Sequence, residues 1–209
     1  MKVFSIQFLS AFVLWAGVVI AGDLNQLPVI SKKEWGGAPV ASDADTASYH
    51  QTPGYITVHH GGVFFAPDKD PVAYLKHLQT FSTDEKGWMD IPYHFLIDPA
   101  GKIYAARPLR FAGDTNTEYD PHGHALICMI GNYEVQKVHP AQLTALIDLI
   151  LALMHDYHIG PEKVATHRDY SRMTVCPGKD LYRYFQDGWI YDMLKSRSHW
   201  KKAHPDSVN

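Results

Sequence analysis

The residues whose types could together hold a metal ion are a pair of adjacent histidines, a third histidine and a cysteine. His59 and His60 end the apolar run of "YITVHHGG". His167 ends the short run "KVATH", and Cys176 follows it in "MTVCPG". A catalytic zinc site takes three nitrogen or sulfur ligands and leaves a fourth position for water. One histidine of the pair, His167 and Cys176 meet that count, although a single histidine at a strand end is more commonly structural.

Only one histidine of the pair can face a shared site. Adjacent residues of a strand point to opposite faces of a sheet. Alternation groups Thr57 with His59 on one face, and Val58 with His60 on the other. Periodicity alone does not decide which face carries the site.

The two cysteines, Cys128 and Cys176, allow two interpretations. In an exported protein, a pair of cysteines commonly forms one disulfide. Their surroundings differ, however. Cys128 lies in the apolar "ALICMIG", typical of a buried free thiol, whereas Cys176 precedes a turn-forming Pro-Gly pair. The second interpretation is that both cysteines are free thiols. The metal hypothesis requires it, because Cys176 must then be available as a ligand.

The elements that must position these residues follow from the pattern of apolar residues. Strands are expected at residues 55–60, 93–98, 102–107, 124–131 and 163–167. Helices are expected at residues 71–82, 140–158 and about 179–185. Because strands and helices interleave, we expect an α/β fold, a single domain with a central mixed β-sheet flanked by helices and the metal site at strand ends.

The start of the chain predicts export. Lys2, a mostly apolar run from residue 8 to residue 20, and small residues after it are typical of a signal peptide, residues 1–22. The alternative is a retained membrane anchor, but the run is short for a full span. We therefore expect a secreted or periplasmic protein without stable membrane insertion. The net charge of −3 gives no basic field, so nucleic acid is not an expected partner.

Several motifs resemble the zinc amidases of the peptidoglycan recognition protein and phage lysozyme-like amidase superfamily. They occur in the family's order, as "KKEWGGAP", "ITVHHGG", "GWMDIPYHFLID", "GKIYAARPL", "MIGNY", "THRDYSRMTVCPG" and "LYRYF". The resemblance covers about residues 28–190. It implies hydrolysis of the amide between N-acetylmuramic acid and L-alanine in peptidoglycan, by a water that one zinc ion per chain activates.

The resemblance also implies roles for single residues. His59, His167 and Cys176 match the family's zinc ligands, which leaves His60 as a neighbour of the site. Tyr93 matches the site tyrosine, which lies near the metal-bound water and the scissile carbonyl in the family. Thr174, two positions before the cysteine, matches a further catalytic position. The loop from His167 to Cys176 is one residue longer than the family's usual loop, so Thr174 is less secure than Tyr93.

Substrate contacts are expected from His60, Arg107 and Asp114. Arg107 can recognise a stem-peptide carboxylate in fork geometry, or it can form a structural ion pair. Asp114 stands near the point where the family commonly has a histidine, so a substrate contact there is lost or changed. Asp169 can orient His167 or cap a turn.

The composition of the termini and the extent of the resemblance divide the chain into four expected parts. These are the signal peptide 1–22, a lead-in 23–54, the amidase catalytic domain 55–190 and a polar C-terminal tail 191–209. A second function on the same fold is a non-catalytic peptidoglycan-binding receptor. Such receptors often lose the zinc cysteine, so the presence of Cys176 and Tyr93 favours the enzyme. A third alternative is a structural zinc site or a disulfide, with the function elsewhere.

Overall fold

The chain folds around a six-stranded mixed sheet, as expected for this α/β fold. The computed structural model describes residues 23–40 and 47–197, so the predicted signal peptide lies outside the described residues. The strands are β1 (Val29–Ile30), β2 (Tyr55–His60), β3 (Phe95–Ile97), β4 (Ile103–Ala105), β5 (His124–Met129) and β6 (Val164–Thr166). Their order is β1-β4-β3-β5-β2-β6. Only the β3–β4 pair is antiparallel among these strands, which confirms the predicted hairpin.

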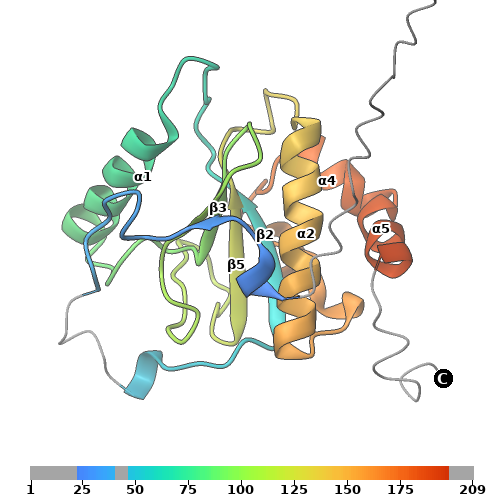
Figure 1. Cartoon of the computed structure of the whole chain (residues 1–209), viewed down its shortest axis with the longest axis horizontal. Coiled ribbons are helices and arrows are strands. Elements are labelled where there is room, and N and C mark those ends of the chain that lie inside the picture. The colour runs from blue at the N-terminus through green and yellow to red at the C-terminus, as the bar shows by residue number, and fades with distance from the viewer. Residues whose placement is uncertain (1–22, 41–46, 198–209) are drawn as a thin grey trace, which may run out of the picture.

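Helices cover both faces of the sheet (Figure 1). They are α1 (Pro71–Thr80), α2 (Pro140–Tyr157), α3 (His167–Tyr170), α4 (Lys179–Gln186) and α5 (Trp189–Arg197). A π-helical turn, η4 (Phe81–Glu85), continues α1, and short 3₁₀ turns are η1 (Leu24–Gln26), η3 (Ala47–Tyr49) and η5 (Pro161–Lys163). Helix α1 lies on one side of the sheet, whereas α2, α4 and α5 lie on the other (Figure 1).

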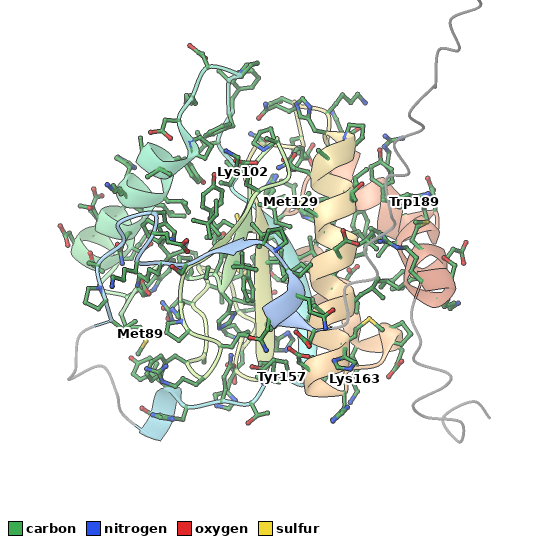
Figure 2. The ribbon with its side chains drawn as sticks, viewed as in Figure 1. Met89, Lys102, Met129, Tyr157, Lys163 and Trp189 are labelled. Carbon is green, nitrogen blue, oxygen red and sulfur yellow. The ribbon has the colours of Figure 1, made fainter. Side chains whose placement is uncertain are left out.

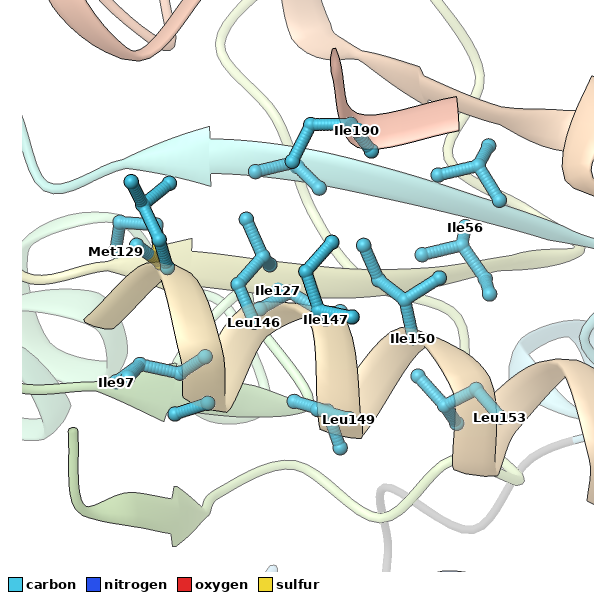
Figure 3. Packing of buried hydrophobic residues seen from close by; sticks show 14 of the residues in the cluster. Ile56, Ile97, Ile127, Met129, Leu146, Ile147, Leu149, Ile150, Leu153 and Ile190 are labelled. Carbon is cyan, nitrogen blue, oxygen red and sulfur yellow. The ribbon is translucent and has the colours of Figure 1, made fainter. Parts of the chain in front are cut away.

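Two apolar clusters fill the spaces between the sheet and these helices, and Met129, labelled in Figure 2, belongs to the larger one. The larger cluster lies beneath α2, where Leu146, Ile147 and Ile150 face the strands (Figure 3). Ile56 and Ile127 meet them from β2 and β5. The smaller cluster lies on the α1 side, so β2 is buried on both faces up to its carboxyl end.

The end of the chain differs from the sequence prediction of a polar tail from residue 191. Helix α5 runs to Arg197, and Ile190 and Leu194 are buried in the larger cluster. These two residues are four positions apart and therefore lie on one face of the helix. The folded unit thus extends beyond the predicted boundary at residue 190, while residues 198–209 lie outside the described residues.

The predicted lead-in also contributes to the sheet. β1 pairs with β4 in parallel, with Val29 opposite Ile103. Trp35 is buried in the smaller cluster, and its Nε1 donates to the Ala105 carbonyl at 2.7 Å. The lead-in is therefore part of the domain. Among the described helices, none combines the length and the apolar composition of a membrane span.

Candidate metal centre

His59, His167 and Cys176 converge at one end of the sheet. Strands β2 and β6 are parallel neighbours with Val58 opposite Thr166, so the histidines that follow these two residues are adjacent. One ligand atom from each of the three residues lies within 4.8 Å of the other two, and all three side chains are buried. His59 Nδ1 is 3.7 Å from Cys176 Sγ. The structure thus brings together the three predicted ligands.

The sheet register separates His59 from His60. Val58 packs in the cluster beneath α2, whereas Cys128, which lies opposite His59 on β5, packs on the α1 side. His59 therefore faces the α1 side with Cys128. His60 Nδ1 instead accepts a hydrogen bond from the Tyr133 amide at 3.2 Å. His60 does not belong to the three-residue cluster, and its predicted substrate contact has no support in this geometry.

A capping box fixes His167 as the first residue of α3. The Asp169 carboxylate accepts from the Thr166 amide at 2.8 Å and from the Thr166 hydroxyl at 2.6 Å. The other oxygen of the same carboxylate accepts from the Tyr182 hydroxyl at 2.9 Å. Asp169 thus has the capping role, the second of its two predicted alternatives, and it positions His167 through the backbone.

Hydrogen bonds also shape the loop that carries Cys176. Thr174 Oγ1 accepts from the Cys176 amide at 3.0 Å, and the Arg168 amide donates to the Cys176 carbonyl at 3.0 Å. The His60 amide points at Cys176 Sγ from 3.3 Å. Both Cys128 and Cys176 are free, so the disulfide alternative is wrong.

The electrostatics of the three side chains fit a cationic metal. Burial holds the pKa of His59 well below its ordinary value and lowers the pKa of His167 to about 4. Both imidazoles are therefore neutral near pH 7, which is the form that binds a metal. Burial raises the pKa of the Cys176 thiol to about 12, against the opposing effect of the His60 amide. A thiolate at this position needs a compensating cation, and the nitrogen, nitrogen and sulfur donors are those that zinc prefers.

Tyr93 lies beside the cluster, just before β3. Its ring centroid is 5.2 Å from that of His59. The side chain is half-buried, and burial, followed by the neighbouring Cys128 and Cys176, holds the pKa of Tyr93 well above its ordinary value. The hydroxyl stays protonated and can donate a hydrogen bond, while it also interacts with the Cys128 side chain.

Arg107 has a structural position and does not face a substrate. It is 1% exposed, and its Nη2 lies 2.5 Å from Asp114 Oδ2. The guanidinium also donates to the carbonyls of Asp90, Ile91 and Ala112, at 2.8, 2.9 and 2.6 Å. This is the ion-pair alternative of the sequence analysis, since the buried guanidinium directs four of its N–H groups to Asp114 and to these carbonyls.

Asp114, the partner of Arg107, borders a pocket of about 360 Å³. Its lining residues are Ser48, Tyr49, Ala112, Gly113, Asp114, Thr115, Asp120, Pro121 and His122. Thr115 Oγ1 is also 3.4 Å from His167 Nε2, so the pocket adjoins the metal centre. Asp114 thus lies at the edge of this pocket, and its contact with a substrate stays a prediction.

Sequence reasoning missed Thr117 and Tyr119, which lie in the loop of residues 113–121. Thr117 Oγ1 lies 2.8 Å from His167 Nε2, and the Tyr119 hydroxyl lies 3.4 Å from His59 Nε2. The stretch "GDTNTEYDP" carries only the signature of a polar loop, so its sequence gave no sign of these contacts. These contacts arise only in the folded chain, where the loop lies against the histidines at the ends of β2 and β6.

Two histidines at the ends of parallel strands and a cysteine from a nearby loop thus form a candidate metal centre in an α/β protein. The chain belongs to the N-acetylmuramoyl-L-alanine amidase family Amidase_2, which matches residues 49–179.

Its relatives carry two kinds of name. Peptidoglycan-recognition protein SC2 of Drosophila simulans is 28% identical over 193 residues, covering 91% of this chain and 97% of that protein. An N-acetylmuramoyl-L-alanine amidase of Sus scrofa is 28% identical over 158 residues, covering 71% of this chain and 25% of the pig protein.

Solved structures share the fold. Drosophila peptidoglycan recognition protein SD superposes with a TM-score of 0.67 at 26% identity, covering 77% of this chain and 94% of that chain. The N-acetylmuramoyl-L-alanine amidase LysC from Clostridium intestinale gives a TM-score of 0.62 at 26% identity, covering 80% and 97%. The family resemblance of the sequence motifs is therefore confirmed.

Proposed function

We propose that the protein is a zinc-dependent amidase that hydrolyses the bond between N-acetylmuramic acid and L-alanine in peptidoglycan. The observation that carries this proposal is the convergence of His59, His167 and Cys176, whose ligand atoms lie within 4.8 Å of one another. The family membership supports the choice of reaction, because members named as amidases share the fold.

The proposed roles follow from the positions of the side chains. His59, His167 and Cys176 would hold one zinc ion, which when bound activates water near neutral pH and polarises a carbonyl. Tyr93 remains a phenol and donates a hydrogen bond to the carbonyl oxygen as negative charge develops on it. The Thr174 oxygen already accepts from the Cys176 amide, and its hydrogen is available for a second contact to the substrate.

The second candidate is a receptor that binds peptidoglycan without cleaving it. The names of several relatives favour this alternative, since they are recognition proteins. Both functions take the same polymer as partner, and both agree with export by the predicted signal peptide. The complete donor set together with Tyr93 favours the enzyme, because binding alone needs no ligand set with an open position.

Digestion of purified peptidoglycan separates the two candidates. The zinc-loaded protein is incubated with the polymer, and the soluble fragments are analysed by mass. We expect new amino-terminal L-alanine and intact glycan strands. New reducing sugar ends would point to a glycosidase, and binding without any cleavage would point to the receptor.

The matched control is Cys176→Ala. This variant removes one ligand and leaves the two histidines, so we expect loss of bound zinc and of amino-terminal L-alanine release together. Zinc content is measured on the same preparations. A variant that kept both its zinc and its full hydrolysis would overturn the ligand assignment.

A further inference from the structure

The loop of residues 113–121 contacts both histidines of the candidate metal centre on their Nε2 atoms. Thr117 Oγ1 is 2.8 Å from His167 Nε2, and the Tyr119 hydroxyl is 3.4 Å from His59 Nε2. Elsewhere on the His59 ring, Nδ1 is 3.7 Å from Cys176 Sγ. The loop therefore contacts Nε2 of the His59 imidazole, whereas the cysteine lies near Nδ1 of the same ring.

The contact to His167 occupies Nε2, and the Thr117 hydroxyl can either accept from an Nε2–H group or donate to an Nε2 lone pair. A neutral imidazole has one N–H donor and one lone pair. If Nε2–H donates to Thr117 Oγ1, the lone pair lies on Nδ1, which is then the atom able to ligate a metal. Thr115 Oγ1 stands 2.9 Å from Thr117 Oγ1 and accepts or donates in the same chain of hydroxyls. Hydrogen bonds of this kind orient a metal-binding histidine and raise its basicity.

Tyr119 supports His59 in a similar way, with packing added to the hydrogen bond. Its ring stacks on Tyr170, with centroids 5.6 Å apart and planes at 20°. It also packs against the His167 ring, with centroids 5.1 Å apart. The aromatic contacts fix the ring of Tyr119, and the hydroxyl is thereby held at His59 Nε2.

Two polar anchors fix the loop itself. Near its start, Asp114 pairs with the buried Arg107. At its middle, the Glu118 carboxylate accepts from Ser171 Oγ at 2.6 Å and from the Arg172 amide at 3.3 Å. Ser171 and Arg172 lie in the connection between His167 and Cys176. The loop is therefore tied to the connection that carries the third ligand.

We propose that the loop of residues 113–121 is a positioning element for the metal centre, in which Thr117 and Tyr119 orient His167 and His59 so that both present Nδ1 to the metal. The inference rests on the proposed function, since it assumes that a metal binds there. It assigns Thr117 and Tyr119 as positioning residues, because neither has to touch the substrate.

The test compares Thr117→Val with Thr117→Ser. Valine keeps the shape of threonine without the hydroxyl, and serine restores the hydroxyl. We expect zinc affinity, measured by competition with a chelator, to fall roughly 10- to 100-fold in the valine variant and to recover in the serine variant. The visible spectrum of the cobalt-substituted protein should shift in the valine variant alone. Thr144→Val, at an exposed position on α2, is the matched control and should bind zinc as the wild type does.

A second measurement uses the wild-type protein, so it does not depend on whether a variant folds. Nitrogen chemical shifts of the zinc-loaded wild type should show a protonated Nε2 and a metal-bound Nδ1 for His167. A metal-bound Nε2 would overturn the inference. Unchanged zinc affinity and cobalt spectrum in Thr117→Val, or equal weakening in the valine and serine variants, would also overturn it and leave the proposed function standing. A wild-type protein that binds no zinc would remove both.

Discussion

At the scale of single residues, the site depends on which nitrogen of each histidine is committed to a hydrogen bond. A backbone amide can only donate, so His60 Nδ1 must be the acceptor in its contact with the Tyr133 amide. Burial also lowers the pKa of His60 to about 4. His60 is thus a neutral, structural histidine, whereas the nearby His59 and His167 remain available to a metal.

The exchange of His60 for alanine tests this division of roles. We expect His60→Ala to retain bound zinc, because the three-residue cluster does not include its side chain. The variant should unfold more easily, by about 1–3 kcal/mol, since the Tyr133 amide loses a buried acceptor. His59→Ala is the matched control and should lose zinc. Loss of zinc from His60→Ala together with retention of zinc by His59→Ala would reverse the assignment within the pair.

Removing the hydroxyl of Tyr93 isolates its chemical role. Tyr93→Phe keeps the ring against His59, so zinc affinity should stay that of the wild type. The rate constant kcat should fall roughly 10²- to 10³-fold, the usual cost of removing one donor to a developing oxyanion. Steady-state kinetics on a defined muropeptide, with zinc content determined in parallel, provides the measurement. Full activity in this variant would exclude Tyr93 from the chemistry.

Residue types alone predicted His167, Cys176 and one histidine of the adjacent pair as ligands, and the family motifs pointed to His59 within that pair. Alternation could not decide between His59 and His60, because both faces of β2 are buried. The choice became visible only in the register with β5, where Cys128 lies opposite His59 and packs on the α1 side. Thr117 and Tyr119 gave no such signal, since hydroxyl groups are common in loops.

At the scale of elements, the strongly patterned segments were predicted well. Strand β2 and helix α2 combine a continuous apolar pattern with clear boundaries, and both lie where the sequence placed them. Helix α5 was missed because only Ile190 and Leu194 are fully buried, and the apolar residues beside them, Trp189, Tyr191 and Met193, obscure the helical period. A nine-residue helix with two buried positions depends on its tertiary contacts, which a local pattern does not contain.

The contribution of α5 can be measured through Leu194. This side chain is fully buried in the cluster beneath α2, so Leu194→Ala should lower the free energy of unfolding by about 2–5 kcal/mol. Lys195→Ala, at the next and exposed position, should change it by less than about 0.5 kcal/mol. Denaturant unfolding of the two variants gives the comparison. Equal stability of both would mean that α5 does not belong to the folded core.

At the scale of the whole molecule, the sheet buries more histidines than the metal centre needs. His94 lies outside the cluster and is 1% exposed. Its Nδ1 accepts from the Leu126 amide at 2.8 Å, so the proton must lie on Nε2, which then donates to the Phe111 carbonyl at 2.8 Å. A second proton would have to bind the Nδ1 lone pair, and the hydrogen bond from the Leu126 amide would then be lost. Burial accordingly lowers the pKa of His94 to about 4, and the nearby Arg107 acts in the same direction.

This arrangement predicts acid sensitivity of the fold. An unfolded histidine titrates near pH 6.5, whereas folded His94 titrates near pH 4. Between these values the unfolded chain binds more protons, so stability is present above pH 6.5 and is lost as the pH falls towards 4. His94 alone should account for about 2 kcal/mol between pH 7 and pH 5. Thermal unfolding of the metal-free protein should therefore show a smaller decrease over this range in His94→Gln than in the wild type. Parallel decreases in the two proteins would show that His94 does not carry the effect.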